Sequence, residues 1–273
     1  MIRRSGTSAL IAVLALAACS DPSTPKTPDP KSVLAASASG LSAGNYRYTV
    51  DMPDVRVEGV TDFASRSAAW TTTFLDPGRM EIEIRLIGQD QYTRTRHDAA
   101  SAANEKKSLR ETAASTDDPH VKADMAAKIR EIETGDDRYR HLDLSRLPKR
   151  TAMTGPPFAD PDRTGATKLI PWVRDATADG STIRGTLSIP RPLGGEALAM
   201  ISERLVDTLP FTASLDEQRR LSRLEINFPT SARGTKPAGR WMLTVDSYGT
   251  APVPERPGTI KETPEDVYDA LES

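Results

Sequence analysis

Cysteine is almost missing from this chain, because Cys19 is the only one among 273 residues. A single cysteine excludes an intramolecular disulfide, which needs two. Aromatic residues are also few, at 5% of the sequence, and apolar residues reach 37%. We therefore expect a slim core of leucine, isoleucine, valine and alanine. The length still allows one large domain with its own core, or two small ones.

An excess of positive charge is missing as well. The chain has 36 lysine and arginine residues against 38 aspartate and glutamate residues. Proteins bind nucleic acid largely by neutralising its phosphates with basic side chains. Nucleic acid is therefore not an expected partner, and a protein partner is not identified by the sequence.

No apolar run approaches the roughly 20 residues that a membrane-spanning helix needs. Residues 9–18 form a stretch of ten without charge, and Arg3 and Arg4 precede it, which is typical of a secretory signal peptide. The stretch ends in Leu16-Ala17-Ala18-Cys19, which resembles the bacterial lipobox. We expect residues 1–18 to be removed and Cys19 to carry a diacylglycerol. The alternative is an ordinary signal peptide with a cysteine near its cleavage site by chance.

Cleavage at that point would also change the charge. Without Arg3 and Arg4, 34 basic residues face 38 acidic ones, a formal charge of −4. The following segment, 20–30, reads SDPSTPKTPDP, a composition that stays extended and buries too little surface to fold. We interpret residues 19–30 as a tether between a lipid anchor and a folded domain. This places the domain in the cell envelope, on the extracytoplasmic face of a membrane.

Beyond the tether, apolar and polar residues alternate over most of the chain, which predicts antiparallel strands with one covered and one solvated face. In the clearest run, Met80, Ile82, Ile84 and Leu86 alternate with charged residues. Glu83 is therefore expected on the solvated face, where a lysine should have almost no effect. Comparable strands are expected at 46–52, 55–63, 70–75, 139–144, 183–189, 211–215, 221–228 and 241–248.

Helices are expected before and between these strands. Asp29 and Pro30 combine an N-cap acceptor with a residue suited to the first helical position, and Gly44 marks the end of that helix. A second helix begins at Asp118-Pro119 within a charged excursion at 97–137, which we interpret as solvated rather than as a binding arm. Further helices are expected over 166–175 and 196–209, and a short one from Thr263. Together these features predict one α+β domain over 31–257 and a tail over 258–273.

Several phrases in order along the chain resemble the LolA/LppX-like bacterial envelope lipoproteins, in particular those of actinobacterial type. They are YRHLDL at 139–144, DGSTIRGTL at 179–187, Leu215-Asp216 followed by Arg220-Leu221, and Tyr248-Gly249 before Val253 and Pro257. The resemblance implies a strongly curved antiparallel sheet, or half-barrel, whose concave face is covered by helices around an apolar cavity that holds acyl chains in several relatives. The excursion at 97–137 is longer than the usual connection, which leaves the ligand and partner open.

Apolar residues on the covered strand and helix faces must be buried against either protein or ligand. We predict that an apolar ligand, in particular a lipid, contacts seven of them: Ile82, Ile84, Leu187, Ile201, Leu205, Ile226 and Leu243. The three tryptophans, Trp70, Trp172 and Trp241, are either pocket residues or simply the largest core residues. The alternative function is a protein-protein interaction or signalling module, whose helices fill the concave face and leave no cavity.

We identify no catalytic constellation and expect a non-enzymatic protein without a cofactor. Ser23 and Lys26 match the S-x-x-K pattern, but they lie in a tether that cannot hold a nucleophile against its base. The three histidines lack the spacing of metal ligands. The segments 160–162 and 175–180 lack the alternating acidic ligands of a calcium loop, so turns explain them better and no metal site is predicted.

Overall fold

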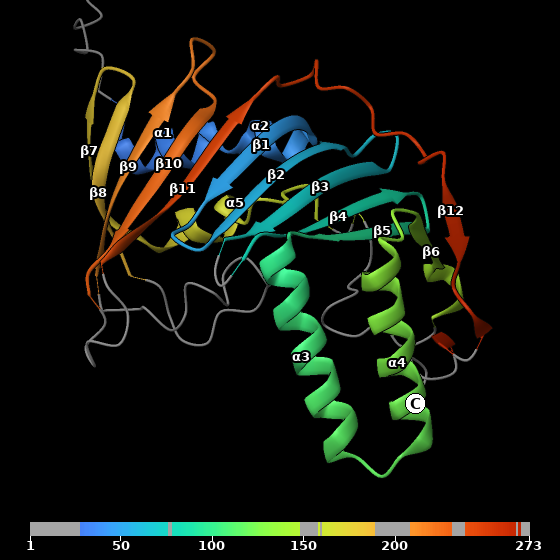
Figure 1. Cartoon of the computed structure of the whole chain (residues 1–273). Coiled ribbons are helices and arrows are strands. Elements are labelled where there is room, and N and C mark those ends of the chain that lie inside the picture. The colour runs from blue at the N-terminus through green and yellow to red at the C-terminus, as the bar shows by residue number, and fades with distance from the viewer. Residues whose placement is uncertain are drawn as a thin grey trace, which may run out of the picture.

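The computed structural model describes residues 28–75, 78–147, 158, 160–188, 208–230, 238–265 and 267–268. Within these residues, one twelve-stranded sheet has the order β12-β6-β5-β4-β3-β2-β1-β11-β10-β9-β8-β7 (Figure 1). Only β12 and β6 pair in parallel among the described strands, and the other neighbours are antiparallel. The predicted α+β class is confirmed. The strands are β1 (Asn45–Asp51), β2 (Val55–Asp62), β3 (Ser67–Phe74), β4 (Met80–Ile87), β5 (Asp90–His97), β6 (Tyr139–Asp143), β7 (Val173–Asp179), β8 (Thr182–Leu187), β9 (Leu209–Leu215), β10 (Leu221–Phe228), β11 (Gly239–Asp246) and β12 (Ile260–Glu262).

The first predicted helix is present but broken in two. The Asp29 side chain accepts a hydrogen bond from the Ser32 amide at 3.1 Å, and this cap starts α1 (Pro30–Ser37). After Ala38 the chain continues as α2 (Ser39–Ala43), which ends at Gly44 in the left-handed region, with φ 76°. Glycine adopts that conformation without the steric cost that a Cβ adds, so the predicted end of the helix is confirmed.

The helix predicted over 166–175 is shorter than expected. It consists of α5 (Ala166–Leu169) and the 3₁₀ turn η3 (Ile170–Trp172). Pro171 lacks an amide hydrogen and cannot continue an α-helix, and the chain enters β7 directly afterwards. Another 3₁₀ turn, η1 (Leu144–Arg146), follows β6. The predicted helix at 196–209 lies outside the described residues, apart from residues 208 and 209.

The charged excursion forms a helical hairpin of α3 (Ala99–Ser115) and α4 (Pro119–Thr134), which projects from the sheet between β5 and β6 (Figure 1). Asp118 caps α4 as predicted, since its carboxylate accepts from the His120 amide at 2.8 Å. Only Leu109 is fully buried among the described residues of the two helices. The predicted apolar stripe of α4 is half-buried: Val121, Met125, Ile129 and Ile132.

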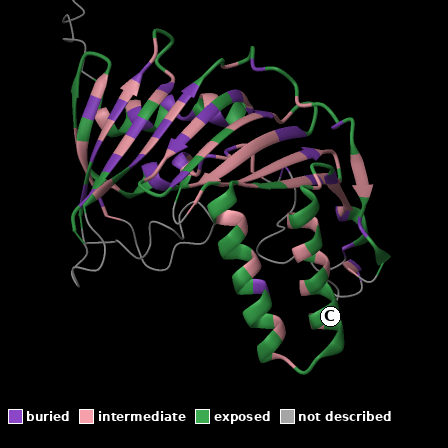
Figure 2. Cartoon of the chain, viewed as in Figure 1, coloured by how far each residue is buried: buried purple, intermediate pink, exposed green. Residues whose placement is uncertain are grey.

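A first core lies on one face of the sheet, which we call the covered face. This face carries Tyr46, Tyr48 and Val50 of β1, and residues of α1, α2 and α5 pack in the same cluster. The most completely buried side chains include Trp241, Leu224, Ile226 and Leu243. In Figure 2, buried residues concentrate on β8 to β11 and β1, whereas β3 and β4 are mostly of intermediate burial. The helices therefore complete the core over one half of the sheet.

A second, smaller core lies at the other end of the sheet. It joins Ala68 of β3 and Leu86 of β4 to Leu144, Leu147, Phe158 and Tyr268. The family resemblance implied a half-barrel covered by helices, and part of this expectation is confirmed. The sheet is single and mostly antiparallel, and the described helices α1, α2 and α5 pack on one of its faces over part of its width. The two cores leave a stretch of sheet between them.

Candidate functional site

The part of the covered face between the two cores is apolar but incompletely buried. Its seven side chains form what we call the open strip, and all of them are of intermediate burial: Val57, Trp70, Thr72, Phe74, Met80, Ile82 and Ile84. The strand register aligns them, since Ile84 faces Trp70, Ile82 faces Thr72 and Met80 faces Phe74. Trp70 packs against both cores, whereas Ile82 and Ile84 belong to neither. The open strip is therefore a mostly apolar surface that borders both cores at Val57 and Trp70 and extends beyond them at Ile82 and Ile84.

One end of the open strip is shaped by a close approach across β2. Gly59 pairs with Tyr48 on one side and with Trp70 on the other. A Cβ on Gly59 would lie 2.4 Å from Cζ and 2.5 Å from Oη of Tyr48, which is too close for any side chain. Glycine at this position therefore allows the Tyr48 ring to lie across β2 and brings its hydroxyl toward Trp70.

A loop over residues 160–165 places a cation at the same end. The Tyr46 hydroxyl donates to the Pro161 carbonyl at 2.9 Å and accepts from the Arg163 amide at 2.9 Å. The Arg163 guanidinium lies 5.9 Å from the Trp70 ring centre and 5.1 Å from that of Phe158. Its Nη2 atom is buried and has no hydrogen-bond partner. Burial lowers the pKa of Arg163, and the guanidinium still stays charged in proteins.

The neighbouring Asp162 is buried and serves the loop itself. One oxygen accepts from the Thr164 amide at 2.8 Å, the Thr164 hydroxyl at 2.6 Å and the Gly165 amide at 3.1 Å. The other accepts from the Thr167 amide at 2.8 Å and its hydroxyl at 2.7 Å. These bonds use the carboxylate to brace a turn, as the sequence favoured. The described part of the chain holds no group of three or more acidic, histidine or cysteine residues that could bind a metal.

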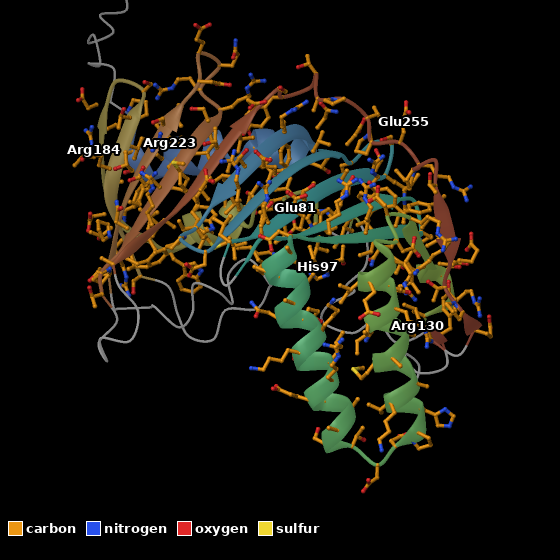
Figure 3. The ribbon with its side chains drawn as sticks, in the orientation of Figure 1. Glu81, His97, Arg130, Arg184, Arg223 and Glu255 are labelled. Atoms are coloured by element: carbon orange, nitrogen blue, oxygen red, sulfur yellow. The ribbon has the colours of Figure 1, made fainter. Side chains whose placement is uncertain are left out.

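The opposite face of the sheet, which we call the outer face, carries a different kind of site. A polar pocket of about 370 Å³ lies between the outer face of β4 to β6 and the segment 255–259, on which Figure 3 labels Glu255. Four arginines, Arg85, Arg94, Arg138 and Arg256, line it with Tyr139 and Asp137. An acyl chain needs apolar walls, so this pocket does not suit one.

Glu83 organises the arginines of that pocket. Its carboxylate accepts from Arg94 at 2.5 Å, from Arg85 at 3.0 Å and from the Tyr139 hydroxyl. Burial by itself would raise the pKa of Glu83, but these hydrogen bonds outweigh burial and lower the pKa to about 2. Its side chain is only 19% exposed. The expectation that Glu83 is a freely solvated residue is therefore wrong, because the segment 255–259 and β6 close over this part of the outer face.

His141 forms a second polar cluster on the outer face and fastens β12. Its Nε2 lies 2.8 Å from Asp90 and its Nδ1 lies 2.5 Å from Glu262, and its ring stacks on Tyr92 with centres 5.0 Å apart. Burial opposes protonation, but the two carboxylates raise the pKa of His141. This cluster explains how a strand of three residues is held at the sheet edge.

Comparison with solved structures finds a match to the lipoprotein LppX of Mycobacterium tuberculosis. The two share 14% sequence identity, the match covers 82% of this chain and 97% of that chain, and the TM-score is 0.40. This chain resembles LppX. This is the family that the sequence phrases resemble, and a match with this TM-score carries no argument about fold, ligand or anchoring. No protein-family model matches the chain, and no curated protein matches it.

The structure distributes the seven predicted ligand residues over different surroundings. Ile82 and Ile84 lie on the open strip, whereas Leu187, Ile226 and Leu243 are fully buried in the first core. Ile201, Leu205 and the predicted lipidation site Cys19 lie outside the described residues. Among the tryptophans, Trp241 is a core residue, Trp70 belongs to the open strip and Trp172 is 41% exposed.

Two features escaped the sequence analysis. The first is Arg163, because no sequence pattern marks a single arginine in a turn as a binding residue. Only the fold places it beside Trp70. The pentapeptide Gly40-Leu41-Ser42-Ala43-Gly44 fits the G-x-S-x-G pattern of a nucleophile elbow, which needs a turn from a strand into a helix. Here Ser42 lies inside α2 and a strand follows, so the context of a nucleophile is lacking.

No described helix is long and apolar enough to span a membrane.

Proposed function

We propose that this protein is a membrane-anchored envelope lipoprotein that binds an apolar ligand, a lipid, without catalysing a reaction. The observation that carries the proposal is the open strip, a set of half-buried apolar side chains on the same face that elsewhere forms the complete first core. An acyl chain laid along it would contribute roughly 0.8 kcal/mol for each buried CH2 group. In this proposal the covered face is the concave side of a curved sheet.

Two of the predicted ligand residues, Ile82 and Ile84, support the proposal by their position. They face Thr72 and Trp70 across the β3–β4 pair, so together they offer a track that is apolar apart from the Thr72 hydroxyl. The three predicted residues in the first core, Leu187, Ile226 and Leu243, would then support the sheet behind the ligand. Their full burial suits such a role.

Charging the open strip should abolish binding of an apolar probe. We expect Ile84→Asp to weaken the binding of oleyl alcohol at least tenfold, because an ionised carboxylate is costly to bury beside an acyl chain. Ile87→Asp is the matched control, since Ile87 is also half-buried on β4 but lies on the outer face. Titration of delipidated protein with fluorescence of the strip's Trp70 as the signal measures both. Equal affinities of the two variants would contradict a site on the open strip.

Anchoring rests on the lipobox at Leu16 to Cys19. We expect Cys19→Ser to abolish incorporation of labelled palmitate in the expressing bacterium and to release the protein from the membrane fraction, because the thiol is the acceptor of the diacylglycerol. Thr27→Ser, a conservative change in the same tether, should leave labelling unchanged. Persistent labelling of the Cys19 variant would show that the anchor lies elsewhere or that the motif is accidental.

A protein-interaction module is the alternative, and the projecting α3–α4 hairpin is the observation that favours it. Its helices expose most of their side chains to solvent, as an arm that contacts a partner would. Native mass spectrometry after detergent-free purification separates the two functions. Co-purified lipid on the wild-type protein supports lipid binding, whereas a lipid-free protein that also fails to bind oleyl alcohol supports the interaction module.

A further inference from the structure

We infer that the apolar ligand carries an anionic head group and that Arg163 binds it at the Trp70 end of the open strip. The inference deepens the proposed function and rests on it. It starts from an imbalance of charge: the guanidinium is largely buried, its Nη2 has no hydrogen-bond partner, and the described residues provide it with no ion pair. A buried charge is costly unless a counter-charge and hydrogen bonds accompany it.

The nearby carboxylates do not meet this need. Asp162 accepts five hydrogen bonds from its own loop, and Asp160 pairs with Lys168 at 3.1 Å. The rings of Trp70 and Phe158 lie against the guanidinium, and the Tyr46 and Tyr48 hydroxyls and Asp160 also act on it electrostatically. Aromatic faces attract a guanidinium, but its buried Nη2 still has no hydrogen-bond acceptor.

The geometry connects this cation to the apolar track. Trp70, which borders Arg163, faces Ile84 on β4, and the strip then runs to Phe74 and Met80. Four residue steps along a strand cover about 13 Å, which accommodates the part of an acyl chain nearest its head group. An amphiphile with its head at Arg163 and its chain along the strip would supply the counter-charge for Arg163 and bury the apolar side chains of the strip. The planar guanidinium suits carboxylate and phosphate heads equally, because both accept two parallel hydrogen bonds.

The arginines of the outer-face pocket make a weaker case for an anion. Arg94 pairs with Glu83 and Asp137, and Arg85 pairs with Glu83 and donates to the Glu255 carbonyl. The charges of these two are therefore balanced within the protein, and Arg138 pairs with Asp136 at 3.0 Å. Arg256 has no ion pair among the described residues, but it is exposed, so solvent compensates its charge. Arg163 differs because its charge is the one that the described loop leaves unbalanced.

The test compares probes that share one chain but differ in the head. Delipidated wild-type protein should bind oleate and oleyl phosphate at least tenfold more tightly than oleyl alcohol, at concentrations below self-association of the probes. Arg163→Gln should lose this preference while binding oleyl alcohol within about twofold of wild type, because the track is unchanged. Arg163→Lys should keep part of the preference, since the charge remains but the planar fork is lost. Arg184→Gln, on the exposed side of β8 and far from the strip in Figure 3, is the control and should behave as wild type.

The outcomes separate the two proposals. Equal binding of oleate and oleyl alcohol by the wild type, or a preference that survives in Arg163→Gln, would overturn the role of Arg163 and leave lipid binding intact. Binding of none of the three probes would overturn both proposals. If Arg163→Gln does not fold, the wild type and Arg163→Lys decide. A preference that is present in the wild type and reduced in Arg163→Lys supports the role of Arg163. A preference that is fully retained in Arg163→Lys, or absent from the wild type, refutes it.

Discussion

Replacing Ile226 by alanine should lower the free energy of unfolding by about 2–5 kcal/mol, the range for removing a large apolar side chain from a packed core. Ile226 is fully buried in the first core and pairs with Trp241 and Phe211 on the neighbouring strands. The same substitution at Ile82 should cost only about 1 kcal/mol, because a half-buried side chain loses less buried area and leaves no closed cavity. The difference between the two losses of unfolding free energy distinguishes a core residue from a residue of the open strip, because the chemical change is the same at both positions.

Urea denaturation of the delipidated protein, followed by circular dichroism, measures both values if the transition is cooperative. An apolar ligand that binds the folded state would stabilise it. Oleyl alcohol should therefore raise the free energy of unfolding of the wild type and of Ile226→Ala by similar amounts. It should raise that of Ile82→Ala by less, because Ile82 lies on the open strip. A loss at Ile82 as large as that at Ile226 would mean that the strip is closed core and offers no ligand surface.

Glu83→Lys should be the second most damaging change, at about 2–3 kcal/mol. The carboxylate lies between Arg85 and Arg94 and accepts from Tyr139, so a lysine would remove the shared acceptor and add a third cation. Breaking a fully buried ion pair costs about 3–5 kcal/mol, and the partial exposure of Glu83 reduces that figure. Glu81→Lys is the matched control on the same face of β4. Its partner Arg79 is largely exposed, and pairs of that kind contribute about 0–1 kcal/mol.

The same residue predicts a pH dependence. The folded-state pKa of Glu83 is about 2, below the ordinary value of 4.5. A depressed carboxylate pKa means that the unfolded state takes up a proton first as the pH falls. The stabilisation by Glu83 is therefore complete above about pH 5 and is lost as the pH falls toward 2. Glu83→Gln should be less stable than wild type at pH 7, and the difference should shrink on acidification. A constant difference between pH 7 and pH 3 would contradict the assigned pKa.

Much of the fold was predictable because the signals for it are local. Successive side chains of a strand point to opposite faces, so the alternation from Met80 to Leu86 predicted both the strand and its apolar side. The caps at Asp29 and Asp118 were predictable because the capping oxygen bonds to an amide two or three residues away. Strand β5 gave no such signal. Its residues are mostly polar on both faces, and its place in the sheet comes from its pairing with β4 and β6.

The candidate site could be predicted only in part. Ile82 and Ile84 were correctly placed on the covered face by their alternation. Their contact with a ligand stays a prediction. The sequence could not separate them from Ile226 and Leu243, because alternation reports which face a side chain is on and not what lies above it. Among the described residues, α1, α2 and α5 pack in the first core, which includes Ile226 and Leu243 but not Ile82 and Ile84.

The sequence by itself determined the α+β class, the period of the strands and the helix caps, all of which depend on residues within a few positions of one another. The export and lipidation motif at Leu16 to Cys19 is equally local, and it stays a prediction. Only the tertiary structure decided that Glu83 is enclosed, that Ile82 and Ile84 are half-buried and outside both described cores, and that Arg163 lies against Trp70. The physical reason is that burial and electrostatic pairing depend on contacts between distant segments. Arg163 is 93 residues from Trp70 in the chain, and the loop that carries it is held by the Tyr46 hydroxyl and by the hydrogen bonds of Asp162.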